Sequence, residues 1–269
     1  MRAFAIFAAV AALAGFSNAD LTHSEMVNET MVAESSLAAA GFSCSKLKPH
    51  LNKADCEYMS KIGIRGQGQN AQSPNGKAWI GTQGPYTFKF TNNAVHPAAR
   101  PVTLILWTWE HAQDYQAMCV NVRAPKISVS LPRPGDSVTV SLAEGVTGAF
   151  ASLDGHETRL NGAGQVDNTW GEFNTAGGYA TFDVSREVNA KGHAMDIRGS
   201  NGCVANLATC VFKCKDANAR SCGAAGSYHL VNCGGGNPGA HTDNGGADGG
   251  CGGWGARGKH LDVLLRWAK

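Results

Sequence analysis

Three acidic residues in the second half of the chain have the types and spacing that glycoside hydrolysis requires. Glu172 and Asp183 lie in two strand-like segments, residues 170–173 and 179–184, and Glu187 follows shortly after. A pair of carboxyl groups held about 5–10 Å apart can cleave a glycosidic bond, one as the acid and the other as the base or nucleophile. Alternatively, acids near strand ends are solvated or cap turns. The sequence therefore predicts Glu172 and Asp183 as candidate catalytic residues, and all three acids as candidate sugar-binding residues.

Tryptophan side chains are the other candidates for contact with a sugar, because their ring faces can stack on sugar rings. Trp107 and Trp109 share one face of a strand, since they are two residues apart. One face of that strand is expected to belong to the core, so a structural role is the alternative. We interpret Trp107, Trp109 and Trp170 as candidate binding residues, and Trp254 as a further aromatic candidate.

Several other chemistries lack their sequence signatures. The chain has no G-x-S-x-G elbow, no P-loop and no dinucleotide-binding fingerprint. His156-Glu157 begins a zincin-like pair, but Leu160 stands where the second histidine is needed. The acidic segment 243–248 lacks the bidentate glutamate and the alternating acids of a calcium loop. We therefore expect no metal and no cofactor.

The N-terminus has the pattern of a cleavable export signal. Arg2 precedes an apolar run at residues 3–16, and small residues lead up to a cleavage site after Ala19. This run is too short to span a membrane, and no later stretch is long enough. The sequence therefore predicts a secreted, extracellular protein without a membrane span. Asn28 heads a sequon and is the predicted glycosylation site.

Cysteine content and charge fit the same environment. Cysteines at this density after an export signal indicate a disulfide framework of up to four bridges with one thiol left over. The spacing of Cys210 and Cys214 resembles half of a zinc site, but no second pair of cysteines or histidines follows at a suitable distance. The net charge of +2 gives no reason to expect a nucleic-acid partner. The candidate disulfide cysteines are Cys44, Cys56, Cys119, Cys203, Cys210, Cys214, Cys222, Cys233 and Cys251.

Alternating and apolar segments predict an all-β fold. Turn residues at 132–136 separate two alternating segments, and a glycine-rich tail precedes a closing strand. Short strands joined by turns favour a β-sandwich. We predict a signal peptide (1–19), an N-terminal extension (20–77), a sandwich core (78–200) and a cysteine- and glycine-rich loop lobe with the closing strand (201–269). The predicted strands are residues 86–92, 102–109, 126–132, 137–142, 148–153, 170–173, 179–184, 194–198 and 260–265.

Four segments, in the same order, resemble the thaumatin-like proteins across residues 85–265. They are Thr87-Phe88-Lys89-Phe90-Thr91-Asn92-Asn93, Pro134-Gly135-Asp136-Ser137-Val138-Thr139-Val140, Gly171-Glu172-Phe173-Asn174 and Phe182-Asp183-Val184-Ser185, and a cysteine-rich region follows them. The resemblance implies a thaumatin-like β-sandwich with a disulfide-rich loop lobe. It also implies an acidic cleft associated with β-1,3-glucan binding and sometimes glucanase activity. Glu172 and Asp183 would be two residues of that cleft.

Two positions depart from this family pattern. The family's second aspartate, five residues beyond the first, falls on Val188, with Glu187 beside it. The family's strand arginine falls within Gly148-Ala149-Phe150, which contains no arginine. These departures favour a member that kept the scaffold and changed its surface.

The chain is also similar in type to small secreted cysteine-rich proteins of filamentous fungi, which implies an effector role in virulence. We therefore interpret it as a secreted effector-type or binding protein, leaning away from an enzyme, that acts on a cell wall or on host immunity. The expected partner is β-1,3-glucan or a host extracellular protein. One alternative is a β-1,3-glucan hydrolase that uses the acidic cleft. Another is a structural wall protein, in which the odd cysteine forms an intermolecular bridge.

Overall fold

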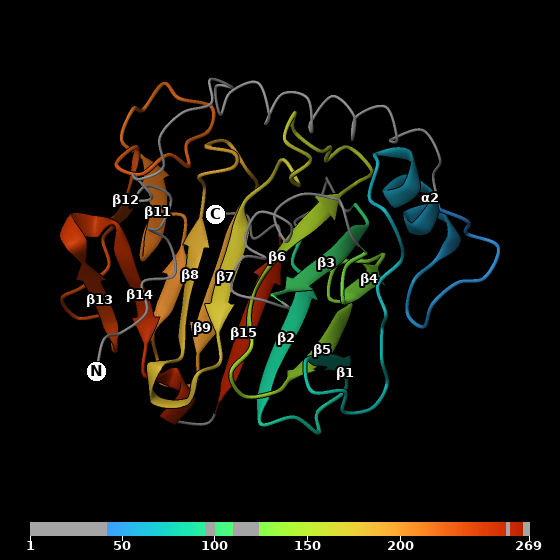
Figure 1. The fold of residues 1–269 in the computed structure, drawn as a ribbon, viewed down its shortest axis with the longest axis horizontal. Coiled ribbons are helices and arrows are strands. Elements are labelled where there is room, and N and C mark those ends of the chain that lie inside the picture. The colour runs from blue at the N-terminus through green and yellow to red at the C-terminus, as the bar shows by residue number, and fades with distance from the viewer. Residues whose placement is uncertain (1–41, 95–99, 110–123, 257–258, 266–269) are drawn as a thin grey trace, which may run out of the picture.

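The computed structural model describes residues 42–94, 100–109, 124–256 and 259–265, which form mostly β-structure (Figure 1). The predicted all-β class is confirmed. The expected signal peptide (1–19), Asn28 and Cys119 lie outside the described residues. In the part of the chain that is described, no helix is both long and apolar enough to cross a bilayer.

The first sheet contains both early and late segments of the chain. Its central strand, β15, runs parallel to β2 on one side and antiparallel to β9 on the other. Over the described ranges the sheet has six strands, which in spatial order are β1 (Ala78–Ile80), β5 (Ser137–Leu142), β2 (Tyr86–Asn92), β15 (His260–Leu265), β9 (Met195–Gly199) and β10 (Val204–Asn206).

The second sheet carries the predicted acidic residues. Antiparallel neighbours run from β4 to β8, and β11 joins β8 in parallel. The hairpin of β13 and β14 pairs with β8 through β14. Its nine strands among the described residues are β12 (Tyr228–Val231), β11 (Val211–Cys214), β8 (Thr181–Ser185), β7 (Trp170–Asn174), β6 (Thr147–Asp154), β3 (Val102–Thr108), β4 (Ile127–Leu131), β13 (Ala240–Asp243) and β14 (Asp248–Gly252).

Aromatic and aliphatic side chains from both sheets meet in one core. Phe88 of β2 packs edge to face against Phe173 of β7, with ring centroids 4.9 Å apart. Phe90 makes a similar contact with Phe150 of β6. These rings are fully or almost fully buried, and such pairs add to the stabilisation from apolar burial. The two sheets therefore form a packed sandwich.

The segments predicted as strands each contain a strand in the structure. The segment 86–92 alternates as expected, and its Phe88 and Phe90 point into the core while Lys89 is exposed. Strand β3 is buried along its whole length, as its unbroken apolar run indicates. The turn at 132–136 leads from β4 in one sheet to β5 in the other.

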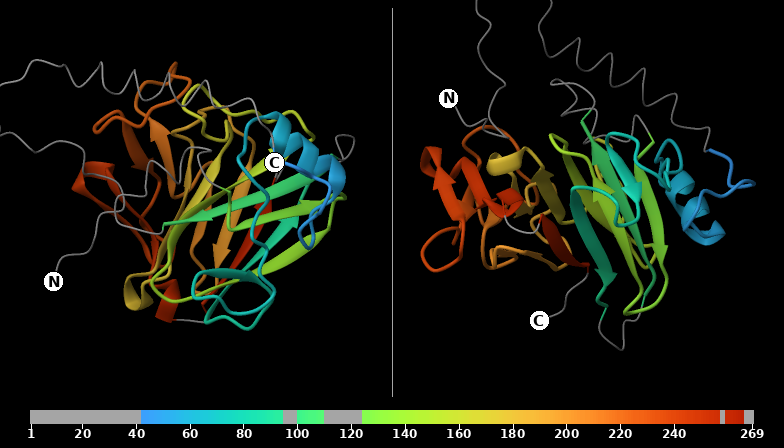
Figure 2. Two further views of the ribbon diagram at one scale, coloured as in Figure 1. Left: turned by 45° about the vertical axis from the view of Figure 1, so that its right-hand side comes forward. Right: turned by 90° about the horizontal axis from the view of Figure 1, so that it is seen from below.

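A second apolar cluster lies on the outer face of the nine-stranded sheet. Helix α2 (Lys53–Lys61) contributes Cys56 and Met59, which pack with Trp107, Ala149 and Trp170. Figure 2 shows α2, in blue, outside the green strands of this sheet. The described part of the expected N-terminal extension thus covers one end of the sheet.

The cysteine-rich segment contains more regular structure than the expected loop lobe. Strands β10 to β14 join one or the other sheet. Close approach explains how the glycine-rich tail forms a strand: a Cβ on Gly250 would lie 2.8 Å from the carbonyl oxygen of Phe182 in β8. Only a residue without a side chain allows this spacing. Short 3₁₀ turns are η1 (Gly177–Tyr179), η2 (Asn244–Gly246) and η3 (Trp254–Ala256).

Eight cysteines of the described residues form four disulfides, which confirms the predicted framework. One closes the local loop in the N-terminal segment, and the other three lie in the cysteine-rich segment. The pairs are Cys44–Cys56, Cys203–Cys251, Cys210–Cys233 and Cys214–Cys222. Disulfides persist in oxidising environments, so the framework is consistent with an extracellular protein.

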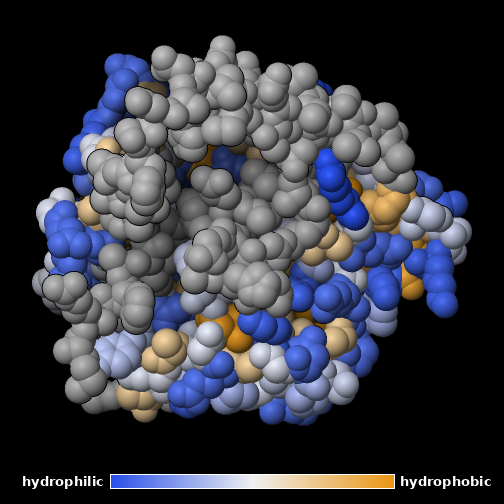
Figure 3. Space-filling view, viewed as in Figure 1, coloured by the Kyte–Doolittle hydropathy of each residue, from blue (hydrophilic) through white to orange (hydrophobic). Residues whose placement is uncertain are grey.

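The described surface is mostly hydrophilic on the face shown in Figure 3, with hydrophobic residues in small separate groups. Leu47 and Tyr179 are the large hydrophobic side chains that are strongly exposed among the described residues. Scattered residues of this kind are normal on a folded protein, so they do not indicate a docking surface.

Candidate functional site

The pairing of β7 with β8 brings two of the predicted acids together. Glu172 and Asp183 are direct partners in the antiparallel register. Their neighbours Phe173 and Phe182 point into the sandwich core. Because side chains alternate along a strand, both carboxyl groups lie on the opposite, outer face of the sheet. Directly opposed residues have Cβ atoms about 5 Å apart, so the two carboxyl groups are neighbours.

Glu187 joins them from the end of β8. Its backbone N–H lies 3.4 Å from the hydroxyl oxygen of Ser185, and that hydroxyl lies 3.5 Å from Glu187 Oε1. The Glu187 carbonyl accepts a hydrogen bond of 2.7 Å from the backbone N–H of Cys222. The cysteine-rich segment therefore fixes the backbone at this acid. The structure thus gathers all three acids that the sequence predicts as binding residues.

The structure adds Asp248 and Tyr228, which the sequence interpretation missed. Burial, with smaller contributions from the charges of Glu187, Asp248 and Glu172, raises the pKa of Tyr228 to about 12. Tyr228 therefore lies within electrostatic reach of acids from separate strands. We call Glu172, Asp183, Glu187, Asp248 and Tyr228 the acidic site. The apolar residues among 228–231 could have indicated a strand that contains Tyr228. Asp248 lies among glycines, which are not typical of a strand, so its sequence gave no such indication.

Burial shifts the protonation of this site. Desolvation holds the pKa of Glu172 well above its usual range, and the charges of Asp183 and Glu187 raise it further. Desolvation and the charge of Glu187 likewise raise the pKa of Asp183 well above its usual range. Desolvation raises the pKa of Glu187 to about 8, against a smaller lowering effect of the Ser185 hydrogen bond. At neutral pH the site therefore retains protons that exposed carboxyl groups would have lost.

Several oxygens of the site are buried without a hydrogen-bond partner. They are Glu172 Oε2, Asp183 Oδ1 and Asp248 Oδ1. Their residues are 7%, 4% and 7% exposed. A buried polar atom without a partner costs about 1–3 kcal/mol, so these three oxygens leave hydrogen-bonding capacity unmet in one part of the molecule.

A row of residues links the acidic site to the second apolar cluster. In register across the sheet lie Trp107 of β3, Ala149 of β6, Glu172 and Asp183. Ala149 stands in the segment where the thaumatin-like pattern has its arginine. A methyl group beside Glu172 offers no positive charge that would stabilise the carboxylate form.

The tryptophans do not form the sugar platform that the sequence suggests. Trp107 and Trp170 are 3% and 1% exposed and stack on each other, with ring centroids 6.0 Å apart. Trp254 is fully buried in the sandwich core, beside Tyr86. These three are core residues, because neighbouring side chains cover the faces that would contact a sugar. Trp109 is half-buried beside the second apolar cluster, away from the acids in the register.

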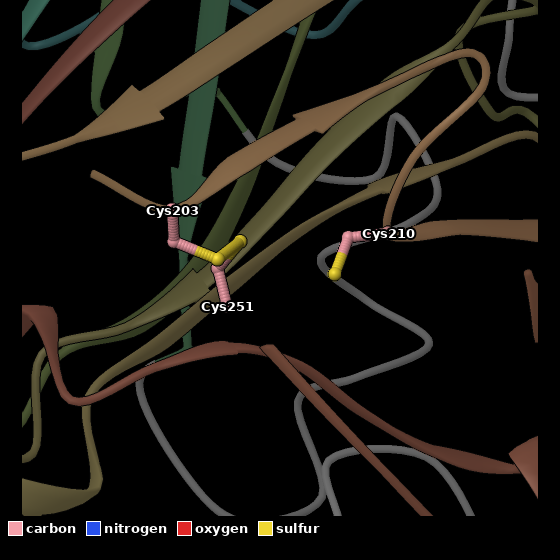
Figure 4. Close-up of side chains that lie close together, drawn as sticks. All are labelled: Cys203, Cys210 and Cys251. Atoms are coloured by element: carbon pink, nitrogen blue, oxygen red, sulfur yellow. A yellow bond between two sulfur atoms is a disulfide. The ribbon is translucent and has the colours of Figure 1, made fainter. Parts of the chain in front are cut away.

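Three cysteine sulfurs lie as close together as metal ligands do. Within the described ranges, the only group of three histidine, cysteine or acidic side chains with ligand atoms within 4.8 Å of one another is Cys203, Cys210 and Cys251. All three sulfurs are already bonded in disulfides. Figure 4 shows the joined Cys203 and Cys251 with Cys210 beside them. A metal needs thiolate sulfur, so this group is a pair of adjacent disulfides rather than a metal centre.

Comparison with known proteins leaves the acidic site as the main guide to function. No protein-family model matches the sequence, and no curated protein matches it.

Proposed function

We propose that this protein is an extracellular carbohydrate-binding protein whose acidic site accepts hydrogen bonds from sugar hydroxyl groups. The observation that carries this proposal is the set of buried, unpartnered oxygens on Glu172, Asp183 and Asp248. Carboxylate oxygens are acceptors, and each sugar hydroxyl is a donor. A bound polysaccharide would supply the partners that these oxygens lack.

The charge of the site favours a neutral ligand. The charged groups that raise the pKa values in this site are all carboxylates. Where these groups are ionised they repel phosphates and acidic sugars, and where they are protonated they offer such ligands or a nucleic-acid backbone no positive charge. Among common extracellular polymers, neutral glucans, chitin and cellulose fit this requirement.

Within that class we propose β-1,3-glucan of a plant or fungal wall. The support is the ordered resemblance of four segments to thaumatin-like proteins, two of which form β7 and β8. The disulfide framework is consistent with secretion. On this proposal the protein is a thaumatin-like sandwich that acts outside the cell as a wall-directed, effector-type protein.

A second candidate function is hydrolysis of the same glucan. The observation that favours it is the raised pKa of Glu187, about 8, beside two further carboxyl groups. A carboxylic acid that stays protonated at neutral pH can protonate the leaving oxygen of a glycosidic bond. A neighbouring carboxylate would then act as the base or the nucleophile.

Sedimentation with insoluble polysaccharides tests both candidates. The mature protein is mixed with β-1,3-glucan, chitin or cellulose, and the pellet and supernatant are compared. We expect retention on β-1,3-glucan, and new reducing ends in the supernatant would add hydrolysis. If no polymer retains the protein, the carbohydrate proposal is wrong, and a host extracellular protein becomes the partner to seek.

Matched variants locate the binding surface. Asp183→Leu and Glu172→Leu replace buried carboxyl groups with apolar groups, and we expect each to lose retention on β-1,3-glucan while remaining folded. Glu144→Leu changes an exposed acid outside the site and should be retained like the parent protein. Retention of both site variants at the parent level would place the binding surface elsewhere.

A further inference from the structure

Two disulfides of the cysteine-rich segment lie close to each other. The sulfurs of Cys203, Cys210 and Cys251 are all within 4.8 Å of one another, although Cys210 is bonded to Cys233 (Figure 4). Thiol–disulfide exchange needs a thiolate next to a disulfide sulfur. If the Cys210–Cys233 bond opened, the sulfur of Cys210 would already be next to its target.

One neighbour of Cys210 can stabilise its thiolate form. The side-chain amide of Asn237 lies 3.7 Å from Cys210 Sγ and can donate a hydrogen bond to it. Asn237 is held in place by bonds of 2.9 and 2.8 Å to the backbone N–H and carbonyl of Val204, which follows Cys203 in the chain. A fixed amide donor stabilises negative charge on a sulfur.

Exposure decides which sulfur an external thiol reaches first. Cys233 is 7% exposed, whereas Cys203, Cys210 and Cys251 are fully buried. Attack at Cys233 makes Cys210 the leaving group, and Cys210 is the sulfur that Asn237 contacts. Accessibility and leaving-group stabilisation therefore favour the same direction of opening.

We propose that Cys210, Cys233, Cys203 and Cys251 form a thiol–disulfide exchange site for a low-molecular-weight thiol. The external thiolate bonds to Cys233 Sγ, the Cys210–Cys233 bond breaks, and its electron pair leaves on Cys210. The Cys210 thiolate then bonds to Cys203 Sγ, and the Cys203–Cys251 bond breaks with its electron pair on Cys251. The first step converts one thiolate and one disulfide into a mixed disulfide and a thiolate, and the second step moves the thiolate to Cys251.

The product of exchange lies beside the acidic site. Cys251 belongs to β14, which also carries Asp248. The preceding residue, Gly250, packs against Asp183 closely enough that an added Cβ would lie 3.5 Å from the Asp183 Cβ. Freeing Cys251 removes the covalent link between β14 and the residue that precedes β10. The exchange site therefore connects the thiol environment to the position of Asp248.

Disulfide mapping of a designed variant tests the proposal. Cys233→Ser, in a Cys119→Ser background, leaves Cys210 as the free thiol next to the intact neighbouring disulfide. After acid quenching and alkylation, we expect peptides that link Cys210 to Cys203 or Cys251, and loss of part of the Cys203–Cys251 peptide. If the folded variant kept the Cys203–Cys251 bond in full and Cys210 were found only as the alkylated thiol, the proposal would be overturned.

A matched control uses the disulfide outside the close group of sulfurs. Cys222→Ser in the same background frees Cys214, and we expect the other three native bonds to remain. Adding Asn237→Leu to the Cys233→Ser variant should slow the appearance of the exchanged peptides. Equal rates with and without Asn237 would remove this residue from the proposed site.

A protein that keeps all four disulfides provides a test that does not depend on removing a cysteine of the proposed site. Cys119→Ser protein is treated with reduced glutathione at concentrations that preserve its circular dichroism spectrum. We expect glutathione on Cys233 together with a bond between Cys210 and Cys203 or Cys251. Glutathione on Cys233 with an intact Cys203–Cys251 bond, or no reaction below the concentration that unfolds the protein, would contradict exchange.

Discussion

At the residue scale, the protonation of Glu187 links the acidic site to stability. The pKa of Glu187 rises from 4.5 to about 8 on burial, so the folded protein binds more protons than the unfolded chain between these pH values. The unfolding free energy therefore falls as the pH rises through this window. Glu172 and Asp183 have raised pKa values and contribute with the same sign.

We predict that Glu187→Gln flattens this pH dependence and raises stability at pH 8. The amide carries no charge to desolvate, and its neighbours Glu172 and Asp183 lose a repulsive partner. Urea unfolding at a series of pH values from 4.5 to 8 measures the effect. Glu144→Gln, at an exposed position, should follow the parent curve. A Glu187→Gln curve with the parent slope would show that this carboxyl group is not protonated by burial.

A glycine on β7 sets how closely the core approaches the acidic strand. A Cβ added to Gly171 would lie 2.2 Å from Cζ of Phe150, and Phe150 packs against Phe90 in the core. We predict that Gly171→Ala lowers the unfolding free energy by about 1–3 kcal/mol, because a rigid ring must move.

Chemical denaturation checks the size of this effect against a control in open space. Gly162→Ala adds a methyl group where nothing lies within 4 Å, and its stability should stay close to that of the parent. If both alanine variants were equally stable, Phe150 would have room to move and the packing beneath Glu172 would be looser than the structure shows.

Site residues in segments that are close in sequence could be predicted, whereas contacts between distant segments could not. Glu172 and Asp183 were found because they lie in two strand-like segments that are close in sequence, and the structure pairs these strands so that the two acids face each other. Asp248 reaches the same surface through the pairing of β14 with β8. No local pattern encodes that pairing, since it depends on glycines that permit close approach. For Trp107 the sequence left a core role open, and it could not show that the cover of Trp107 and Trp170 comes from the distant helix α2.

At the element scale, α2 depends on its attachments, because a nine-residue helix is marginal by itself. Asn52 caps its start by accepting a 2.8 Å bond from the Asp55 backbone N–H. His156, in the turn after β6, contacts the buried Asp55 carboxyl at 2.5 Å. The Cys44–Cys56 disulfide closes the loop that leads into the helix.

We predict that the double variant Cys44→Ser/Cys56→Ser lowers the free energy of opening α2 by about 3 kcal/mol. Removing a disulfide that closes a loop of this length restores about that much entropy to the open segment. Native-state hydrogen exchange should show faster exchange in α2 with little change in β7 and β8.

The disulfide in the cysteine-rich segment provides the comparison. Cys214→Ser/Cys222→Ser removes the bond next to Glu187, so its effect should fall on β11 and β12 while α2 keeps its protection. If Cys44→Ser/Cys56→Ser instead accelerated exchange equally in every strand, α2 would be an inseparable part of the sandwich rather than a locally opening unit.

At the scale of the whole molecule, the sandwich closes only when the last strand is in place. Strand β15 lies between β2 and β9 in the six-stranded sheet. It pairs along its whole length with β2, so His260 is the partner of Thr87. The sequence predicted this closing strand from its apolar pattern. It could not predict the parallel neighbour, because a pairing across most of the chain leaves no local signal.

We predict that a chain ending at Ala256 does not unfold cooperatively. Without β15, Phe88 and Ile197 on the flanking strands lose their partners Leu261 and Val263, which are fully buried, and two sheet edges are left open to aggregation. Circular dichroism during heating should show a gradual change, and size-exclusion chromatography should show aggregates. A sharp transition would mean that the remaining strands form a stable sandwich alone.

A synthetic peptide of residues 259–265 distinguishes a missing strand from a general loss of chain length. Its backbone can complete the ladders of β2 and β9, and its Leu261, Val263 and Leu265 side chains fill the core positions that are fully buried in the intact protein. We expect the peptide to restore a cooperative transition to the truncated chain. A peptide with Val263→Asp should not, because it would bury an unpaired charge between the two sheets. Equal rescue by both peptides would mean that β15 acts only by covering the sheet edges, and that its side chains are not what holds the two sheets together.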